Sequence, residues 1–594
     1  MQLTGDRFTS ASALYGNDLA TLPEYPAEIR APAGTVAGVS AFQVQISDHD
    51  ITTPGDAPDV LVAMNPAALR AELDRVVPGG TVIVNVDTFD ERNLHKAGYE
   101  SNPLTDGTLD GYTVIEVPMT RLTRDACEPL GVKPRDAERS KNFFALGLVS
   151  WLFSRPLEPT IDWIHKKFAG RDQVIAANEA ALRAGHAFGE TSELSAYRVR
   201  VRPAHLPAGT YTNINGNTAL SWGLVAASQK AGLPLFLGSY PITPASDILH
   251  ELARHKNFGV RTLQAEDEIA AVGAALGASY GGHIGVTTTS GPGLALKAET
   301  IGLAVSLELP LVIVDVQRGG PSTGLPTKTE AADLLFATYG RHGEAPLPIV
   351  AARSSADCFD AAIEAVRIAL THMTPVILLT DGYLANGTEP WRIPEIAELP
   401  DIPVRFATEP NHTGPDGEPV FWPYLRDENL VRPWALPGTP GLMHRIGGLE
   451  KQDGSGNVSY DPDNHEHMVH LRAERIARIA EDIPLASIDG DASSDVLVVG
   501  WGSTWGAIRS AVQLLAERGR PVAHCHLTHL NPFPRNLGEI LASYRRVLVP
   551  EMNLGQLSRL LRAEYLVDAT TISKVRGRPF MAAELADRIE EALS

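Results

Sequence analysis

At 594 residues, the chain is too long for one ordinary hydrophobic core, and about 100–200 residues per domain predicts three to five domains. Its formal net charge of −20 argues against the broadly basic surface that binds nucleic acid or an anionic membrane. Cys127, Cys358 and Cys525 stand far apart, so the chain alone offers neither a disulfide framework nor a cysteine-ligated iron–sulfur cluster.

The N-terminus begins M-Q-L-T-G-D-R-F and lacks the basic and apolar segments of a secretory signal. The longest apolar stretch, residues 143–153, is much shorter than the roughly 20 residues of a membrane-spanning helix. We therefore expect a soluble, cytoplasmic protein.

The first region, residues 1–190, alternates apolar strands with helices and predicts an α/β layer with a mainly parallel sheet. We expect strands within residues 57–63 and 81–86, and helices at residues 66–77, 143–153 and 173–185. Residues 191–216, which include Pro203 and Pro207, are expected to form a linker.

The second region, residues 217–390, has the pattern of an open, doubly wound parallel sheet. Its expected strands are residues 233–237, 262–264, 285–289, 311–316 and 376–379, and its expected helices are residues 244–254, 267–281 and 294–308. The strand L-V-I-V-D-V is nearly all aliphatic, as a strand covered on both faces would be. Ligands of such sheets bind beyond the carboxyl ends of the strands.

Eleven prolines between Pro390 and Pro440 argue against regular structure there. We therefore expect residues 391–485 to form an ordered, surface-covering extension that ends in an amphipathic helix near residues 464–480. Residues 486–594 again alternate strand and helix and predict a third α/β region.

The motif G-S-Y-P-I-T-P follows the first strand of the second region. Because Pro244 suits the first position of a helix, we expect Thr243 to be the N-cap. An ordinary helix start is the simpler interpretation of this motif. Tyr240 and Pro241 nevertheless add an aromatic wall and a rigid turn, which a cap does not require.

The next turn, A-E-D-E, precedes a helix made mostly of Ala and Gly. Glu266 and Asp267 are explained by the stabilising effect of acidic side chains at a helix N-terminus. Glu268 differs if it points into the sheet crevice, because a buried carboxyl group can share a proton with a heterocyclic nitrogen.

Two further strand ends carry polar groups. The segment T-T-T-S-G-P-G, residues 287–293, is expected to be a loop with open amides, although ordinary turn chemistry is the simpler interpretation of the segment alone. Arg318 follows the aliphatic strand, where its guanidinium could grip a carboxylate in bidentate fashion. Pairing of Arg318 with a neighbouring acid is an equal alternative at this point.

Three other motifs resemble functional sites without meeting their spacing. In G-G-P-S-T-G-L-P-T-K-T, Leu325 follows Gly324, so the register of a nucleotide phosphate loop fails. The run H-E-H-M-V-H lacks the spacing of a zinc helix and predicts solvated histidines. In V-G-W-G-S-T-W-G, Trp505 occupies the third glycine position of a dinucleotide fingerprint, which favours a tight turn capped by Thr504.

Together, Y-P-I-T-P-A-S-D, A-E-D-E-I-A-A-V-G-A-A-L-G-A-S, T-T-T-S-G-P-G and R-G-G-P-S-T-G-L-P-T-K-T resemble the α subunit of 2-oxoacid:ferredoxin oxidoreductases, most of all the 2-oxoglutarate type. H-R-I-G-G-L-E, E-M-N-L-G-Q and K-V-R-G-R-P-F are also similar to this family. The resemblance implies an N-terminally fused γ domain at residues 1–190, a pyrimidine-binding domain at 217–390 and a transketolase C-terminal-like domain at 486–594. Family γ domains open with a strand and a glycine-rich loop, which this sequence lacks, and a start codon assigned too late would explain the difference.

The resemblance implies thiamine diphosphate shared with a β subunit, which would supply the diphosphate contacts, Mg²⁺ and a [4Fe–4S] cluster. By motif match, Glu268 corresponds to the catalytic glutamate that binds the aminopyrimidine ring, and this chain holds no metal. The implied substrate contacts are Thr243, Arg318 and Thr327, with Arg318 on the 2-oxoacid carboxylate. The implied cofactor contacts are Tyr240, Pro241, Ile242, Glu268, Ser290 and Gly291.

The implied reaction converts 2-oxoglutarate and coenzyme A to succinyl-CoA and CO2 while reducing ferredoxin, in an α2β2 assembly without nucleic acid or membrane. The same chemistry on pyruvate, branched-chain or aryl 2-oxoacids is the first alternative. A non-catalytic subunit that only positions a partner is the second.

Overall fold

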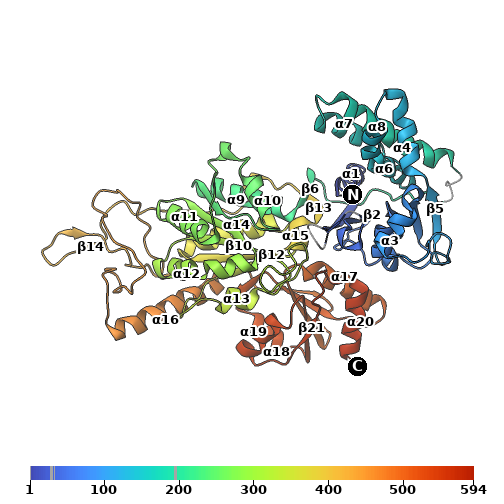
Figure 1. Cartoon of the computed structure of the whole chain (residues 1–594). Coiled ribbons are helices and arrows are strands. Elements are labelled where there is room, and N and C mark those ends of the chain that lie inside the picture. Colours follow the sequence, from blue (N-terminus) through green and yellow to red (C-terminus); the bar gives the residue numbers. More distant parts are fainter. Residues whose placement is uncertain (1, 27–30, 33, 193–196, 594) are drawn as a thin grey trace. The chain divides into compact units, whose positions relative to one another are not determined.

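The computed structural model describes residues 2–26, 31–32, 34–192 and 197–593. The chain folds into two compact units, which Figure 1 colours by sequence. The first unit comprises Met1–Asn213 with Thr388–Trp391, and the second comprises Ile214–Gly387 with Arg392–Ser594. Parallel strands alternate with helices in both units, which confirms the predicted α/β class. Within the described ranges, no helix is both long and apolar enough to cross a membrane.

The first unit contains a parallel sheet in the order β3-β4-β5 and an antiparallel pair, β1 with β2. The strands are β1 (Asp18–Glu24), β2 (Ala41–Ser47), β3 (Val60–Ala63), β4 (Thr81–Asn85) and β5 (Thr113–Val117). The helices are α1 (Gln2–Leu14), α2 (Pro66–Glu72), α3 (Glu91–Ala97), α4 (Met119–Cys127), α5 (Pro134–Ala137), α6 (Lys141–Leu152), α7 (Glu158–Lys167) and α8 (Asp172–Thr191).

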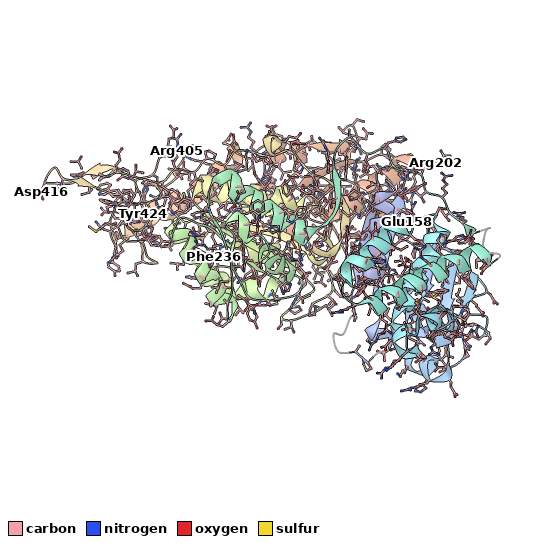
Figure 2. The ribbon with its side chains drawn as sticks, turned by 90° about the horizontal axis from the view of Figure 1, so that it is seen from above. Glu158, Arg202, Phe236, Arg405, Asp416 and Tyr424 are labelled. Carbon is pink, nitrogen blue, oxygen red and sulfur yellow. The ribbon has the colours of Figure 1, made fainter. Side chains whose placement is uncertain are left out.

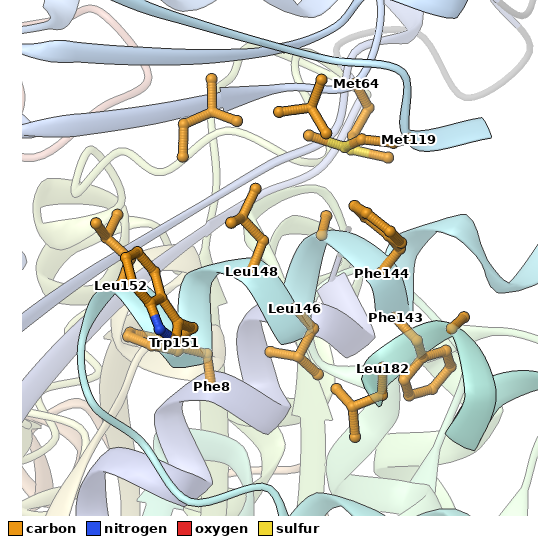
Figure 3. Packing of buried hydrophobic residues seen from close by; sticks show 14 of the residues in the cluster. Phe8, Met64, Met119, Phe143, Phe144, Leu146, Leu148, Trp151, Leu152 and Leu182 are labelled. Carbon is orange, nitrogen blue, oxygen red and sulfur yellow. The ribbon is translucent and has the colours of Figure 1, made fainter. Parts of the chain in front are cut away.

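Helix α6 forms the centre of the largest core cluster of this unit. Figure 3 shows its aromatic and aliphatic side chains, Phe143 to Leu152, between Leu182 of α8, Phe8 of α1 and the methionines Met64 and Met119. Two glycines permit the close approach of α6 and α8: a Cβ on Gly147 would lie 1.9 Å from the Leu182 carbonyl oxygen, and one on Gly185 would lie 1.9 Å from that of Phe144. Small residues at the crossing therefore determine the packing distance of the two helices.

Part of the expected linker, residues 193–196, lies outside the described residues. The segment does not stay irregular to its end, because β6 (Tyr211–Asn215) pairs with β13 (Thr388–Arg392) in a two-stranded sheet. Extended pairing satisfies the backbone groups that a free linker would leave to water.

The second unit is built on a seven-stranded sheet in the order β19-β11-β12-β10-β9-β7-β8. All strands are parallel except β19, which pairs antiparallel with β11. All seven residues of β10 are buried, as its aliphatic sequence predicts. The strands are β7 (Leu235–Ser239), β8 (Arg261–Gln264), β9 (Ile284–Thr289), β10 (Leu311–Gln317), β11 (Ile349–Ala351), β12 (Pro375–Asp381) and β19 (His529–Asn531).

Helices cover this sheet: α9 (Gly216–Ala231), α10 (Ser246–Leu252), α11 (Glu268–Tyr280), α12 (Gly291–Leu307), α13 (Leu334–Tyr339), α14 (Cys358–His372) and α15 (Gly382–Asn386). Two of them begin elsewhere than expected. Helix α10 begins at Ser246, so Thr243 is not its N-cap; the Thr243 carbonyl accepts from Arg318, and the Ile242 carbonyl accepts from the Ser246 amide. Helix α12 begins at Gly291, so the expected Gly-Pro-Gly loop is its first turn, in which proline is well tolerated.

The same unit contains a five-stranded sheet in the order β16-β18-β17-β20-β21, with only β16 antiparallel to its neighbour. Its strands are β16 (Ile488–Gly490), β17 (Val496–Trp501), β18 (Ala523–Leu527), β20 (Arg546–Glu551) and β21 (Ala569–Ser573). Its helices are α17 (Thr504–Glu517), α18 (Leu537–Ala542), α19 (Gln556–Tyr565) and α20 (Ala582–Leu593). Strand β19 leaves this region to join the edge of the seven-stranded sheet.

After β13, the proline-rich extension forms a single 3-10 turn (Ile396–Glu398) and the hairpin of β14 (His412–Thr413) and β15 (Pro419–Val420) before helix α16 (Pro462–Arg478). Figure 2 shows Asp416 at the tip of this hairpin, far from Phe236 of β7, while Tyr424 lies where the segment packs back. There the buried Glu308, next to the end of α12, accepts from Arg426 at 2.6 Å and lies 2.5 Å from Arg475. Burial acts to raise the pKa of Glu308, but Arg475 and Arg426 outweigh it and hold that pKa below its usual value.

Candidate active site

The predicted site residues gather at the carboxyl edge of the seven-stranded sheet. Strands β7, β9 and β10 are neighbours and parallel, so the residues that follow them emerge at the same edge. Tyr240 follows β7, Ser290 follows β9 and Arg318 follows β10, while Glu268 begins the helix after β8. The sheet therefore brings together residues that are up to 78 positions apart in sequence, from Tyr240 to Arg318.

Glu268 is buried, with 8% of its surface exposed, at the first position of α11. Asp267 caps this helix, since its carboxylate accepts from the Ala270 amide at 2.8 Å. The Glu268 side chain lies against the first turn of α12: a Cβ on Gly293 would be 2.8 Å from Glu268 Cγ and 3.1 Å from Oε1. Only glycine at this position leaves room for the carboxyl group.

Lys297 is a buried residue of this site that the sequence-based prediction missed. Its Nζ donates to the main-chain carbonyl of Glu268 at 3.0 Å, and the residue has 0% exposure. Burial lowers the pKa of Lys297 to about 8, although the nearby charge of Glu268 acts in the opposite direction. A lysine within the apolar run G-L-A-L-K-A was the available signal, because a buried lysine needs a specific partner.

Several hydroxyl groups at this edge are buried without a hydrogen-bond partner. Ser290 Oγ and Thr287 Oγ1 make no bond to any residue that the structure describes, and Ser290 does not cap α12 with its side chain. Ser239 and Thr288, in contrast, bond to each other at 2.8 Å. Buried polar atoms are normally satisfied, so unpartnered ones at a strand edge indicate a place where a ligand binds.

Arg318 is held by main-chain carbonyls rather than by an acid. Its guanidinium donates to the Thr243 carbonyl at 2.7 Å and to the Thr323 carbonyl at 3.1 Å, and its buried Nε bonds to no described residue. Burial lowers its pKa, and the charge of Asp333 partly offsets this effect. A guanidinium has five N–H donors, so this arrangement leaves donors for a bidentate contact with a ligand carboxylate.

Two carboxyl groups, Asp315 and Asp333, face each other behind Arg318. Burial raises the pKa of both carboxyl groups, most strongly that of Asp315, and the neighbouring Asp333 raises the pKa of Asp315 further. The Asp333 carboxylate also covers the start of α12, because a Cβ on Gly291 would lie 2.8 Å from its Oδ2. The lone acid in L-V-I-V-D-V was the sequence signal for this pair, which the prediction did not use.

The remaining predicted residues are more accessible. Tyr240 is 38% exposed, Pro241, Ile242 and Thr327 are half-buried, and Thr243 is exposed apart from its bonded carbonyl. Thr327 lies on the loop that leaves β10 and returns through the bond from the Gly319 amide to the Lys328 carbonyl, at 2.9 Å. This loop brings Thr327 to the same end of the sheet as Arg318.

The motifs judged non-functional have structural roles. His465 Nδ1 lies 2.8 Å from Glu450 and His467 Nε2 lies 3.0 Å from Asp453, both histidines are exposed, and the described residues contain no group of ligands suited to a metal ion. Thr504 does not cap α17 as expected. It is the first residue of that helix, and its hydroxyl bonds back to Trp501 because Ser503 occupies the capping position.

Comparison with protein families assigns most of the chain. Residues 227–453 match the family described as pyruvate flavodoxin/ferredoxin oxidoreductase, thiamine diphosphate-binding. Residues 1–188 match pyruvate ferredoxin/flavodoxin oxidoreductase, and residues 494–585 match pyruvate:ferredoxin oxidoreductase core domain II.

Individual relatives extend this similarity to the full length. A 2-oxoglutarate oxidoreductase subunit KorA of Mycobacterium tuberculosis is 57% identical, over 100% of this chain and 90% of its own. A 2-oxoglutarate synthase subunit KorA of Methanothermobacter marburgensis is 31% identical over 63% of this chain and 97% of its own. The solved 2-oxoglutarate:ferredoxin oxidoreductase of Magnetococcus marinus, with 2-oxoglutarate, coenzyme A and succinyl-CoA bound, is 31% identical with a TM-score of 0.85 and covers 100% of this chain and 97% of that one. The chain therefore belongs to the α subunits of the 2-oxoacid:ferredoxin oxidoreductase family.

Proposed function

We propose that this chain is the α subunit of a thiamine diphosphate-dependent 2-oxoglutarate:ferredoxin oxidoreductase. With its partner it converts 2-oxoglutarate, coenzyme A and oxidised ferredoxin to succinyl-CoA, CO2 and reduced ferredoxin. The observation that carries this proposal is the burial of Glu268 and Arg318 at one sheet edge. The specificity for 2-oxoglutarate rests on the relatives, above all the 57% identical subunit.

The residues at the strand ends fit the pyrimidine half of thiamine diphosphate. A buried carboxyl group, Glu268, lies beside a first helical turn that has no room for a side chain at Gly293, and Ser290 offers an unpartnered hydroxyl group. When bound, the cofactor supplies the electron sink for decarboxylation. Glu268 would hold a proton for the pyrimidine nitrogen, and Tyr240, Pro241, Ile242 and Gly291 would line the place of the ring.

Arg318 binds the carboxylate of the 2-oxoacid through its free N–H donors. The carbonyl groups of Thr243 and Thr323 fix the plane of the guanidinium, which restricts the orientation of the substrate. The raised pKa values of the buried Asp315 and Asp333 favour their neutral forms, which compete less with the substrate carboxylate for Arg318. Thr327 contributes to substrate recognition from the loop.

The exposed faces of α11 and α12, the two helices beside Glu268, suit an interface with a partner subunit. The outer face of α11 consists of Ile269, with 54% exposure, and of Gly273 and Gly277, whose Cβ positions meet no atom within 4 Å. On α12, Leu296 is 53% exposed. An apolar face of small residues beside the site suits close packing of a β subunit that brings Mg²⁺ and the [4Fe–4S] cluster, and the assembly is α2β2.

A substrate survey on the complex co-expressed with its β subunit tests the proposal. We expect the reduction of a low-potential dye to require both 2-oxoglutarate and coenzyme A, with kcat/KM for 2-oxoglutarate above that for pyruvate, branched-chain and aryl 2-oxoacids. A preference for one of those acids would reassign the substrate. A complex that binds no thiamine diphosphate would instead support a positioning subunit.

A further inference from the structure

The segment E-M-N-L-G-Q, residues 551–556, runs from the last residue of β20 to the first residue of α19 and forms the turn between them. Glu551 has 0% exposure, and its carboxylate accepts from the Leu557 amide at 2.7 Å, the Ser558 amide at 3.1 Å and the Trp501 indole at 3.2 Å. Asn553 accepts from the Gly555 and Gln556 amides, each at 2.8 Å. These hydrogen bonds fix the main chain of the turn, and with it the direction of the side chains that leave it.

This turn bonds to residues 331–335, which follow the substrate loop, the segment of residues 319–328 that carries Thr327. The Asn553 amide donates to the Ala331 carbonyl at 2.7 Å, and the Ala331 amide donates to the Met552 carbonyl at 3.3 Å. Gln556 donates to the Ala332 carbonyl at 2.6 Å and accepts from the Leu335 amide at 2.9 Å. One side-chain amide thus bonds the main chain on both sides of Asp333.

Asp333 connects this contact with Arg318. Its amide donates to Gln317 at 3.0 Å, and Gln317 donates to the Thr380 carbonyl at 3.1 Å, so β10 holds Asp333 from the other side. The Asp333 carboxylate faces the charge of Arg318 and the start of α12. A shift of residues 332–335 would therefore change the electrostatic surroundings of Arg318.

We propose that Gln556 is a positioning residue of the substrate site. It fixes residues 332–335, and through them Asp333 and the loop that carries Thr327, so the five-stranded sheet serves as the support of the substrate loop. This inference rests on the proposed function, in which Arg318 binds the 2-oxoacid. It assigns to the motif E-M-N-L-G-Q a role in substrate affinity.

A role confined to joining the two sheets is the alternative. Other contacts already join them, among them the bond from Ser503 to Asp381 and the pairing of β19 with β11. If Gln556 only joined the sheets, its loss would lower thermal stability and leave KM unchanged. If Gln556 positions the loop, its loss should raise KM and leave thermal stability nearly unchanged, because the other contacts still hold the two sheets together.

The test compares Gln556→Met with the wild type in the complex with the β subunit. Methionine keeps the length of the side chain but removes both hydrogen bonds, so we expect KM for 2-oxoglutarate to rise about 10-fold. We expect kcat to stay within about 2-fold and the melting temperature to fall by no more than about 2 °C. Glu564→Gln, an exposed position on the same helix, is the matched control and should change none of these values.

Gln556→Glu keeps the acceptor for the Leu335 amide, so its KM should rise less, about 3-fold. It also decides the question if the methionine variant does not fold. Hydrogen exchange of the substrate-free complex gives a readout that needs no particular substrate. The Gly319, Leu325 and Lys328 amides, which bond within the loop, should exchange faster in both variants and not in the control.

An unchanged KM together with unchanged exchange of the loop would overturn the inference, as would a fall in melting temperature at constant KM. If the wild-type complex prefers another 2-oxoacid, the same comparison with that acid tests the role of Gln556. Failure of the proposed specificity is thereby separated from failure of this inference.

Discussion

The two sheets of the second unit use similar strand-to-helix turns for different purposes. At the carboxyl edge of the seven-stranded sheet, Ser290 Oγ, Arg318 Nε and the Asp333 Oδ2 atom are buried without a bond to any described residue. At the corresponding edge of the five-stranded sheet, Thr504 and Glu551 are bonded within the protein. A turn that binds a ligand keeps polar atoms unpartnered, whereas a turn that supports the fold satisfies them.

The largest effect should come from the seven-stranded sheet. Glu268→Gln keeps the size of the side chain but removes its ability to hold a proton, so we expect kcat of the complex to fall at least 100-fold. Glu266→Gln, at an exposed position in the same turn, should retain nearly wild-type kcat. Equal activity of the two variants would remove Glu268 from the chemistry.

Arg318→Lys should have the next largest effect. Lysine keeps the charge but cannot make a bidentate contact or hold both carbonyls, so we expect kcat/KM for 2-oxoglutarate to fall about 100-fold. The control is Arg254→Lys, whose side chain is 75% exposed. A change in kcat/KM of less than about 3-fold would mean that another group binds the carboxylate.

The five-stranded sheet should respond through stability instead. Ser503→Ala removes a buried donor to Asp381, whose carboxylate then loses one of its bonds, so we expect the free energy of unfolding to fall by about 2 kcal/mol. Activity at moderate temperature should persist. Ser543→Ala, at an exposed position, is the control and should change the free energy of unfolding by less than about 0.5 kcal/mol. A loss of activity in Ser503→Ala without a loss of stability would contradict the division of roles between the two sheet edges.

The smallest effect concerns acid stability. Burial lowers the pKa of His524 to about 4, whereas its unfolded value is about 6.5. Between these values the unfolded chain binds the additional proton, so stability falls as the pH is lowered from about 6.5 to 4. The melting temperature should therefore fall less between about pH 6.5 and pH 4 in His524→Asn than in the wild type. His470→Asn, at an exposed position, serves as the control. An equal fall in melting temperature in all three proteins would exclude His524 as a contributor to acid stability.

Apolar runs predicted the central strands of the two larger sheets, because a run such as L-V-I-V-D-V reports burial directly. They did not predict strands nearer the sheet edges, among them β11 and β21. The same patterns did not reveal that α10 starts at Ser246 or that the Thr243 carbonyl accepts a long-range bond from Arg318. Lys297, Asp333 and Gln556 were missed for a related reason. Their partners lie on other elements, and residue type alone does not identify a distant partner.

The prediction for the edge of the seven-stranded sheet also had a physical limit. Strand β19 joins it from a region almost 150 residues beyond β12, and its short sequence, H-L-N, has no strand periodicity. The four motifs around Glu268 and Arg318 nevertheless indicated the correct family. Their turns depend on local backbone geometry, which the residue types of the motifs reveal without knowledge of distant partners.

Binding of thiamine diphosphate tests the central claim most directly. We would measure its dissociation constant by calorimetry, with Mg²⁺ present, for this chain alone, for the β subunit alone and for the complex. The account predicts that the complex binds at least 10-fold more tightly than either chain, and that Glu268→Gln weakens binding to the complex while Ser503→Ala does not. Equally tight binding by the β subunit alone, or binding unaffected by Glu268→Gln, would contradict a site shared between the two subunits.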